Sequence, residues 1–424
     1  MWEGTGASRT NPEGGSTLKG SHKLLRLVAV LGILVVVAAG CSREESGGDA
    51  GAGGETKTVK IGFVGPLTGS LASLGLGMKN SIDLAVKEAN EAKKIEGWNI
   101  VFDPQDDAGK PETGANAANK LASDPDMAGV VGTLQSSISQ QVAPVLSRAN
   151  IVQVSPANTN DTLTRGTDFA TSPKRVWPTY FRLATLDSLQ GPFGADYAYD
   201  QAGFKSVATV HDKLTYGQGL VATFTDQWKK IGGTVTSANT IAEGDRDFGA
   251  LVTKIVNEKP DLVYYGGQFP EAAPLSAQLK DRGFKGVVMG GDGMQADDFI
   301  TGGGSDGDLG TQVGAPVSKL PEAAKFTGAY EAGGYKEASG PYGALSYDSA
   351  NVIIAALAKA LPGKDSVEAA RPDILSAMQQ TSGFQGVTGT HSFDEFGDTS
   401  NKVLTVYKVE GKEWKDAFTG QFEA

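Results

Sequence analysis

Short runs rich in β-branched residues alternate with longer amphipathic segments along most of the chain, and this alternation is what most constrains the fold. The first run, Thr58–Val64, reads TVKIGFV and has the composition and length of a strand, and an amphipathic segment at 75–94 follows it. Strands connected by helices pair in parallel through right-handed crossovers, with helices on both faces of the sheet. We therefore expect an α/β fold of doubly wound parallel sheets. Further strands are predicted at 99–103, 127–131, 151–154 and 180–183, with helices at 112–123 and 137–148.

The same alternation restarts near residue 189 and continues to about residue 290, which indicates a second, similar half. About 370 residues follow residue 57, more than one hydrophobic core usually serves, so two lobes are expected. The strands predicted in this half are 206–210, 235–239, 262–265 and 286–289, and the helices are 189–202, 218–231, 248–258 and 272–282. The remainder supplies helices at 345–361 and 372–381 and a final strand at 403–409.

An apolar segment at Leu27–Ala39 ends two residues before Cys41, the only cysteine of the chain. Basic residues precede this segment, which is too short to span ~30 Å of hydrocarbon as a helix. A charged segment, a short apolar segment and small residues before a cysteine are typical of a lipoprotein signal. We predict that residues 1–40 are a cleaved signal peptide, that Cys41 is lipidated, and that 41–57, rich in Gly, Ser, Ala and Glu, is a flexible tether. The alternative is an ordinary signal peptide followed by a cysteine that carries no lipid.

Charge and cysteine content narrow the possible functions. The whole chain has a net charge of −11, and residues 1–40 hold four basic and two acidic side chains, so the remainder carries −13. An acidic surface of this kind makes nucleic acid an unfavourable partner. With Cys41 used as an anchor, no thiol remains for a disulfide or a cysteine metal site. The expected location is extracytoplasmic, lipid-anchored to the cell membrane.

Small polar clusters follow the predicted strands. In open parallel sheets, ligands bind outside the carboxyl ends of strands, where helix N-termini present free N–H groups. Two such rims facing each other would form one cleft between the lobes. Each cluster also has an alternative interpretation as an ordinary turn or helix cap. The clusters are 65–69, 134–137 and 155–159 in the first half, and 211–217, 266–268 and 291–293 in the second.

The residue types in these clusters suit a zwitterion. Ser136, Ser137 and Thr159 supply hydroxyl groups, and the helix that opens at Ser137 supplies partial positive charge, a combination that suits a carboxylate. Asp292 suits an ammonium group, and Tyr216 adds an aromatic wall. Either charge left unpaired in a closed site would cost several kcal/mol, so a zwitterion needs both partners.

The chain resembles the branched-chain amino acid receptors of ABC transporters, the leucine/isoleucine/valine-binding type of the type I periplasmic binding fold. The resemblance covers nearly the whole exported chain and rests on five stretches taken together. These are 65–69 (GPLTG), 106–108 (DDA), 155–157 (SPA), 211–213 (HDK) with 216–219 (YGQG), and 261–267 (DLVYYGG).

This resemblance implies a role for each matching residue. The serine at Ser136 and the threonine at Thr159 would hold the ligand carboxylate, and the backbone carbonyl of Ala157 and the acid at Asp292 would hold the ammonium group. Tyr216 matches a wall tyrosine from the second lobe. It also implies two lobes joined by hinge strands, the first formed by 58–190 plus 316–388 and the second by 191–315 plus 389–424.

Departures from the family pattern bear on the choice of ligand. Leu74 and Gln268 stand where members that bind amino acids often place aromatic rings, and the Gln268 amide is a poor surface for leucine. Asp292 is one methylene shorter than the common glutamate, so the ammonium group sits closer or is bridged by water. A cysteine pair that some members carry would fall at Gly109 and Gln135. The segment 167–179 looks like an extra loop without an assigned role.

A hydrolase and a sensor subunit are the two alternative functions. A hydrolase is disfavoured because the exported chain holds only His211 and His391 and spells out neither a nucleophile elbow nor a zinc helix. The adjacent acids Asp106 and Asp107 are expected to form a strand-end turn. A sensor subunit would normally carry its own membrane helix, and none follows Cys41.

We therefore expect a monomeric, lipid-tethered receptor that closes on a branched-chain or related amino acid and delivers it to an ABC permease. It is not expected to be an enzyme or to hold a metal or cofactor. Amides, urea and aromatic acids remain open as ligands.

Overall fold

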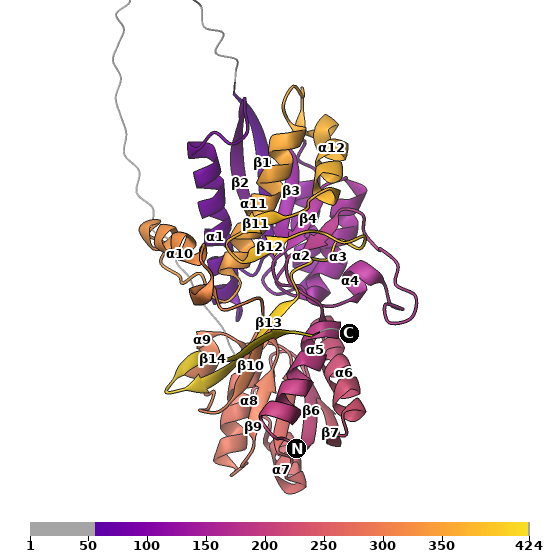
Figure 1. The fold of residues 1–424 in the computed structure, drawn as a ribbon, viewed down its shortest axis with the longest axis vertical. Coiled ribbons are helices and arrows are strands. Elements are labelled where there is room, and N and C mark those ends of the chain that lie inside the picture. The colour runs from indigo at the N-terminus through magenta and orange to yellow at the C-terminus, as the bar shows by residue number, and fades with distance from the viewer. Residues whose placement is uncertain (1–55, 423–424) are drawn as a thin grey trace, which may run out of the picture. The chain divides into compact units, whose positions relative to one another are not determined.

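The computed structural model describes residues 56–422, and the predicted signal peptide, Cys41 and nearly all of the predicted tether lie outside the described residues. The first sheet is wholly parallel, as predicted, with the order β2-β1-β3-β4-β5 (Figure 1). Its strands are β1 (Lys57–Gly65), β2 (Trp98–Asp106), β3 (Met127–Gly132), β4 (Val152–Ser155) and β5 (Tyr180–Arg182).

Helices cover both faces of this sheet because side chains on a strand alternate between the faces. Ile61 and Phe63 of β1 belong to one core cluster, which includes residues of the helices on the first face. The next residue, Val64, belongs to a separate cluster formed with the helices on the other face. The first face is covered by α1 (Ala72–Glu91), α11 (Gly343–Ala360) and α12 (Val367–Gln379), and the second by α2 (Pro111–Ala122) and α3 (Ser136–Arg148).

The second sheet has the order β14-β13-β10-β9-β8-β6-β7 and is mixed. The strands from β7 to β10 run parallel, whereas β13 pairs antiparallel with both β10 and β14. The second sheet is therefore parallel over β7 to β10, as predicted, and β13 and β14 add an antiparallel edge to it. The strands are β6 (Ser206–His211), β7 (Thr234–Thr240), β8 (Leu262–Gly266), β9 (Val287–Gly290), β10 (Leu309–Val313), β13 (Val403–Glu410) and β14 (Glu413–Gln421).

The helices of the second half flank this sheet, and α5 and α6 pack closely together. The predicted helix at 189–202 begins earlier and ends earlier, as α5 (Asp187–Asp196), and continues as a short π-helical segment, Tyr197–Gln201. The others are α6 (Thr215–Lys230), α7 (Gly249–Glu258), α8 (Phe269–Asp281) and α9 (Asp297–Thr301).

The chain passes between the two sheets three times. Residues 183–186 lead from β5 to α5, residues 314–342, which include α10 (Ala323–Ala332), lead from β10 to α11, and residues 392–402 lead from the β11–β12 hairpin (Phe384–Gly386 and Gly389–His391) to β13. We call these the first, second and third crossovers, and we call the bodies around the two sheets the first and second lobes. Among the described helices, none is both long and apolar enough to cross a membrane.

Candidate functional site

The rim of the first lobe is built from the loops that follow β3 and β4. Ser136 is the first residue of α3 and is buried, and Ser137 beside it is half-buried. After β4, the Ser155 hydroxyl accepts hydrogen bonds from the backbone N–H groups of Ala157 (3.2 Å) and Asn158 (2.8 Å). This turn places Thr159 in the interior, where its side chain is fully buried.

A buried network holds these two loops together. The Asn158 carboxamide oxygen accepts hydrogen bonds from the hydroxyls of Ser139 on α3 (2.6 Å) and Tyr180 on β5 (3.0 Å). Its amide nitrogen donates to the Leu134 carbonyl (2.9 Å), one residue before the N-cap of α3. The predicted carboxylate-binding residues Ser136 and Thr159 therefore lie on two loops that one side chain ties together. Asn158 was not among the residues that the sequence predicted for the site.

The rim of the second lobe centres on Asp292, which follows β9 and begins a short 3₁₀ turn. Its carboxylate is buried and accepts hydrogen bonds from the hydroxyls of Tyr216 (2.9 Å) and Tyr342 (2.8 Å). Burial raises the pKa of Asp292, and these hydroxyls oppose the rise. An ideal Cβ at Gly291 would lie 2.3 Å from the Tyr216 hydroxyl oxygen, so only glycine lets the turn approach this tyrosine. Tyr216 and Asp292 are thus in direct contact through a hydrogen bond.

Tyr342 was not singled out from the sequence, although it is decisive for the geometry. It directly precedes α11 of the first lobe, so its hydrogen bond to Asp292 crosses between the lobes. Nothing in the segment GPYG at 340–343 distinguishes it from an ordinary turn before a helix.

A second buried acid, Asp187, was also missed. It is the first residue of α5 and is fully buried, and one carboxylate oxygen accepts a hydrogen bond from the Asn160 amide (3.3 Å). The other oxygen has no hydrogen-bond partner among residues 56–422. Burial raises the pKa of Asp187 well above its usual range, the Asp161 charge raises it further, and the Thr159 hydroxyl partly opposes the rise. Asp187 therefore lies beside Thr159, but in sequence it looks like a helix-capping aspartate.

Gln268 and Leu74 are located by the atoms and the cavity next to them. Gln268 precedes α8, is buried, and lies against Gly293, where an ideal Cβ would be 2.8 Å from its carboxamide oxygen. Leu74 is buried on α1 and lines a cavity of about 780 Å³ that residues of both lobes form, including Gln295 and Trp414. Gln268 thus joins Asp292 at the second rim, while Leu74 lies at an opening between the lobes.

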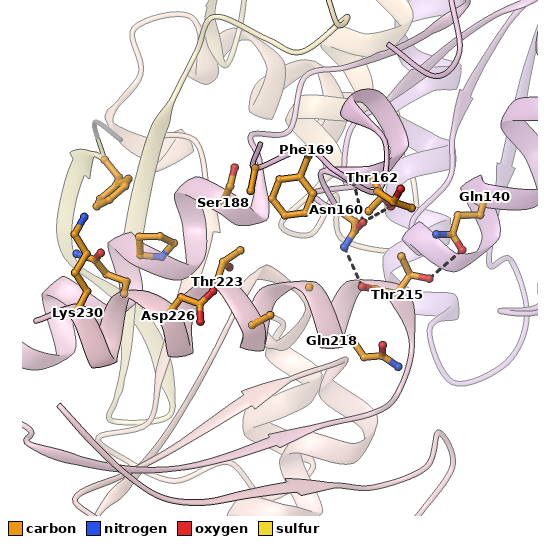
Figure 2. A pocket seen from close by; sticks show the side chains of 17 residues that line it. Gln140, Asn160, Thr162, Phe169, Ser188, Thr215, Gln218, Thr223, Asp226 and Lys230 are labelled. Atoms are coloured by element: carbon orange, nitrogen blue, oxygen red, sulfur yellow. Dashed lines mark hydrogen bonds between the residues drawn. The ribbon is translucent and has the colours of Figure 1, made fainter. Parts of the chain in front are cut away.

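The lobes touch each other beside these rims, so the structure is closed. The Asn160 amide of the first lobe donates to the Thr215 carbonyl at the start of α6 (3.0 Å), and the Thr215 hydroxyl donates to Gln140 (3.0 Å). Figure 2 shows these contacts at the end of a second cavity, of about 750 Å³, that lies between α6 and Phe169. The extra loop predicted at 167–179 contributes Phe169 to that cavity.

The remaining candidates from the sequence have structural roles. Asp106 at the end of β2 accepts hydrogen bonds from the N–H groups of Leu67 (2.8 Å) and Ala108 (2.8 Å), and Asp107 accepts one from Gly109 (2.9 Å). These contacts are those of the predicted turn. His391 lies buried between the hydroxyls of Thr388 and Thr399, and burial lowers its pKa to about 4. Among residues 56–422, no group of His, Cys, Asp and Glu side chains is arranged to hold a metal ion.

Two α/β lobes that contact each other, with a helix N-terminus in the first and buried acids at their junction, form an arrangement that can bind a small polar solute. Residues 58–413 match the sequence profile of the family described as periplasmic binding protein. The chain belongs to this family.

Known members of the periplasmic binding protein family resemble the chain over most of its length. It is 32% identical to the Leu/Ile/Val-binding protein homolog 3 of Brucella melitensis over 352 residues, which cover 82% of this chain and 91% of that protein. The leucine-binding protein LivK of Thermotoga maritima has a similar structure, with a TM-score of 0.76, 27% identity, and coverage of 85% of this chain and 98% of that one. LivJ of Streptococcus pneumoniae, solved with isoleucine, gives a TM-score of 0.76 and 26% identity, with coverage of 86% and 100%.

Proposed function

We propose that the protein is the solute receptor of an ABC importer and that it closes its two lobes over a single α-amino acid. The observation that carries this proposal is a pair of buried acids near the junction of the lobes: Asp187, which lies beside Thr159, and Asp292, which accepts a hydrogen bond from Tyr342. Two carboxylates in a closed site are costly unless a cation or donor group compensates them.

The first lobe would bind the ligand's carboxylate. The N-terminus of α3 presents free N–H groups and partial positive charge, and the hydroxyls of Ser136 and Ser137 add donors there. The Thr159 hydroxyl has no partner at hydrogen-bond geometry among the described residues, but it lies close enough to Asp187 to lower the pKa of that carboxyl. Turned toward the ligand, it would donate to the ligand's carboxylate instead.

The ligand's ammonium group would lie between the Ala157 carbonyl, Asp292 and Asp187. Both oxygens of Asp292 already accept tyrosine hydroxyls, whereas one oxygen of Asp187 is unpartnered in the described structure. We therefore assign Asp187 a direct contact with the ammonium group, with Asp292 supplying charge and fixing Tyr216. An ammonium group has three N–H donors. The Ala157 carbonyl and the unpartnered Asp187 oxygen would each accept from one of them.

The side-chain end of the ligand would face Leu74 and Gln268. Relatives are named for binding leucine, isoleucine and valine, and we extend this class, branched-chain or related amino acids, to the protein. The unpartnered Gln268 carboxamide oxygen favours a ligand that can also offer a donor or a bridging water at this end.

The location follows from the N-terminal sequence. Residues 1–40 would be removed on export, and lipid on Cys41 would hold the receptor at the outer side of the cell membrane by the tether 41–57. The receptor would act as a monomer whose two lobes move against each other about the crossovers. The sequence predicted these lobes as 58–190 plus 316–388 and 191–315 plus 389–424, whereas the crossovers divide them at 183–186, 314–342 and 392–402, so that α5 and Asp187 belong to the second lobe.

A binding screen tests the proposal. We would titrate the exported protein calorimetrically with leucine, isoleucine, valine, polar amino acids, urea and benzoate, with thermal shift as a first pass. A ligand at 100 times its Kd stabilises the protein by about 2.7 kcal/mol. Asp292→Ala is expected to lower affinity for the best amino acid at least about 100-fold, because it leaves a buried ammonium group less compensated. Asp306→Ala, at an exposed loop, is the matched control. Binding of benzoate or urea but of no amino acid would refute the proposal.

A further inference from the structure

Arg182 is a fully buried charged side chain at the end of β5. Its guanidinium donates through Nη1 to two backbone carbonyls, those of Asn158 (3.1 Å) and Asn160 (2.9 Å). These carbonyls lie on either side of Thr159. A planar guanidinium fixes its partners in direction as well as distance, so the backbone at Thr159 is held from both sides.

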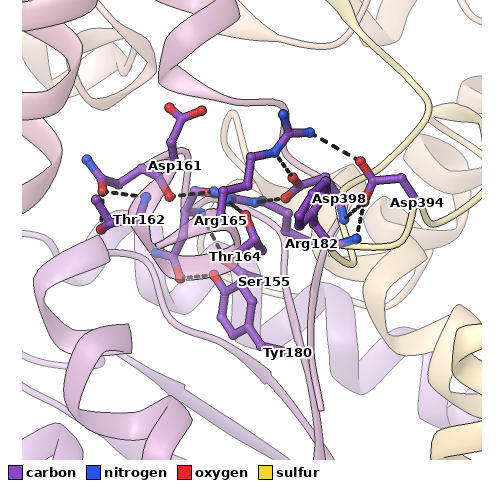
Figure 3. A network of polar contacts seen from close by, with 12 residues as sticks. Ser155, Asp161, Thr162, Thr164, Arg165, Tyr180, Arg182, Asp394 and Asp398 are labelled. Carbon is purple, nitrogen blue, oxygen red and sulfur yellow. Dashed lines mark hydrogen bonds and ion pairs between the residues drawn. The ribbon is translucent and has the colours of Figure 1, made fainter. Parts of the chain in front are cut away.

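The same side chain is anchored to the third crossover (Figure 3). Arg182 Nε donates to Asp398 Oδ1 (2.6 Å), and the Arg182 backbone N–H donates to the Gly397 carbonyl (3.0 Å). Arg165 Nε binds the other oxygen of Asp398 (2.8 Å). Burial alone would raise the pKa of Asp398, but the two arginines outweigh it and lower that pKa. The ion pair is therefore charged throughout the neutral range.

The Thr159 loop is tied to the first crossover as well. The Thr159 carbonyl accepts a hydrogen bond from the Asp187 backbone N–H (2.8 Å), and the Asp161 carboxylate accepts bonds from the N–H (3.0 Å) and hydroxyl (2.5 Å) of Ser188. The backbone carbonyls of residues 158, 159 and 160 are thus all fixed. The first and third accept from Arg182, which is bound to the third crossover, and the second accepts from Asp187, which directly follows the first crossover.

The extra loop at 167–179 reinforces the third crossover. Arg175 donates to the carbonyls of Glu395 (3.0 Å) and Pro178 (2.9 Å), and its guanidinium lies 4.9 Å from the ring centre of Phe181. The loop is therefore fastened to the turn that carries Asp398.

We propose that Arg182 is a positioning residue for ligand binding. Through Asp398 it couples the backbone at Thr159 to the third crossover. The loop that would bind the ligand's carboxylate is then positioned by a segment that connects the two lobes and that would move when they close. This inference rests on the proposed role of Thr159 in the amino acid site.

A purely structural role is the rival explanation, and Arg371 provides the comparison. Arg371 is also buried and also holds backbone carbonyls, those of Asp124 (2.8 Å), Met127 (3.2 Å) and Ala149 (3.3 Å). It lies on α12, and none of these contacts reaches the Thr159 loop. Loss of either arginine is expected to reduce stability, but only Arg182 should act on affinity through Thr159.

A double-mutant cycle on amino acid affinity separates these roles. We would measure calorimetric Kd values and urea unfolding for Arg182→Lys, Thr159→Ala, the double variant and Arg371→Lys. Arg182→Lys is expected to weaken binding about 10- to 100-fold, since charged hydrogen bonds to the loop are lost. In the double variant it should add less than about threefold to the effect of Thr159→Ala. Arg371→Lys should lower stability and change affinity less than about twofold.

The remaining outcomes show whether the proposed amino acid site or only the positioning role of Arg182 is wrong. If Thr159→Ala leaves affinity unchanged, the proposed site itself is wrong. If Thr159→Ala weakens binding but Arg182→Lys has no effect or a fully additive one, only the positioning role is overturned. If Arg182→Lys does not fold, Thr164→Val is the alternative variant, because it removes only the hydroxyl that accepts a hydrogen bond from Arg182 Nη2. It is expected to lower affinity about two- to fivefold in the wild-type background and to have no effect in the Thr159→Ala background. Unchanged affinity in Thr164→Val together with additivity would overturn the role.

Discussion

Gly219 on α6 is the position where one added methyl group most directly opposes closure. An ideal Cβ there would lie 2.2 Å from the Asn160 amide nitrogen and 3.0 Å from an Asp187 carboxylate oxygen. Asn160 belongs to the first lobe and Gly219 to the second. The Asn160 side chain cannot turn away without loss, because it donates to Thr215 (3.0 Å) and Asp187 (3.3 Å) and accepts from Thr162 (2.6 Å).

The size of the effect follows from these contacts. Relieving the overlap by moving Asn160 or opening the lobes would cost about 1–3 kcal/mol in lost hydrogen bonds and packing. If the ligand binds only the closed state, that free energy appears in full as lost affinity. Gly219→Ala is therefore expected to raise the Kd about 5- to 150-fold. Calorimetry would measure the Kd, and small-angle scattering would measure the decrease in radius of gyration on ligand addition.

Gly328 on α10 provides the matched control. It is also a helical glycine, but an ideal Cβ there meets no atom within 4 Å. Gly328→Ala should leave affinity unchanged and raise stability by about 0.5–1 kcal/mol, the ordinary gain of alanine in a helix. Wild-type affinity and normal compaction in Gly219→Ala would refute the reasoning, because they would mean that the observed closure is not needed for binding.

Three further predictions test other parts of the account. Burial raises the pKa of Asp107 to about 7, so between about pH 4 and pH 7 the unfolded state ionises before the folded state does. As the pH rises from about 4 to about 7, the free energy of unfolding should therefore fall by up to about 4 kcal/mol because of this carboxyl group. Asp107→Asn should remove that part of the fall, as measured by urea unfolding at pH 5 and pH 8, and an unchanged slope would contradict it. Gln268→Tyr should raise affinity for leucine or valine several-fold in calorimetry, and no change would place Gln268 outside the site. Tyr342→Phe removes the hydroxyl that reaches Asp292 from the other lobe and should weaken amino acid binding about 3- to 30-fold at similar stability; wild-type affinity would remove Tyr342 from the closing mechanism.

The strands and the loops that follow them could be predicted because they depend on local patterns. β1, β6 and β8 coincide with their predicted runs to within one or two residues, since β-branched composition and length define them. β14 was missed because its sequence, EWKDAFTGQ, is mostly exposed and lacks a clear hydrophobic alternation. Its pairing with β13 decides its structure, and pairing is not visible in one segment.

The candidate site could be proposed from the sequence where the resemblance supplied residue positions, but contacts that depend on distant partners could not be predicted. Asp292 follows β9 and Tyr216 lies in a matching stretch at the start of α6, and the two side chains are hydrogen-bonded. Asp187 resembles a helix cap in sequence, and only its complete burial beside Thr159 makes it a candidate for the site. Arg182 and Asp398 are separated by 216 residues, and no local pattern connects them.

A crystal structure of the exported protein with its best-binding amino acid would test the central claim most directly. The account predicts that the ligand's carboxylate lies at the N-terminus of α3 within hydrogen-bond distance of Ser136 and Thr159, and that its ammonium group contacts Asp187 or Asp292 of the second lobe. A ligand held by one lobe alone, or one lodged in the cavity beside Phe169, would contradict it.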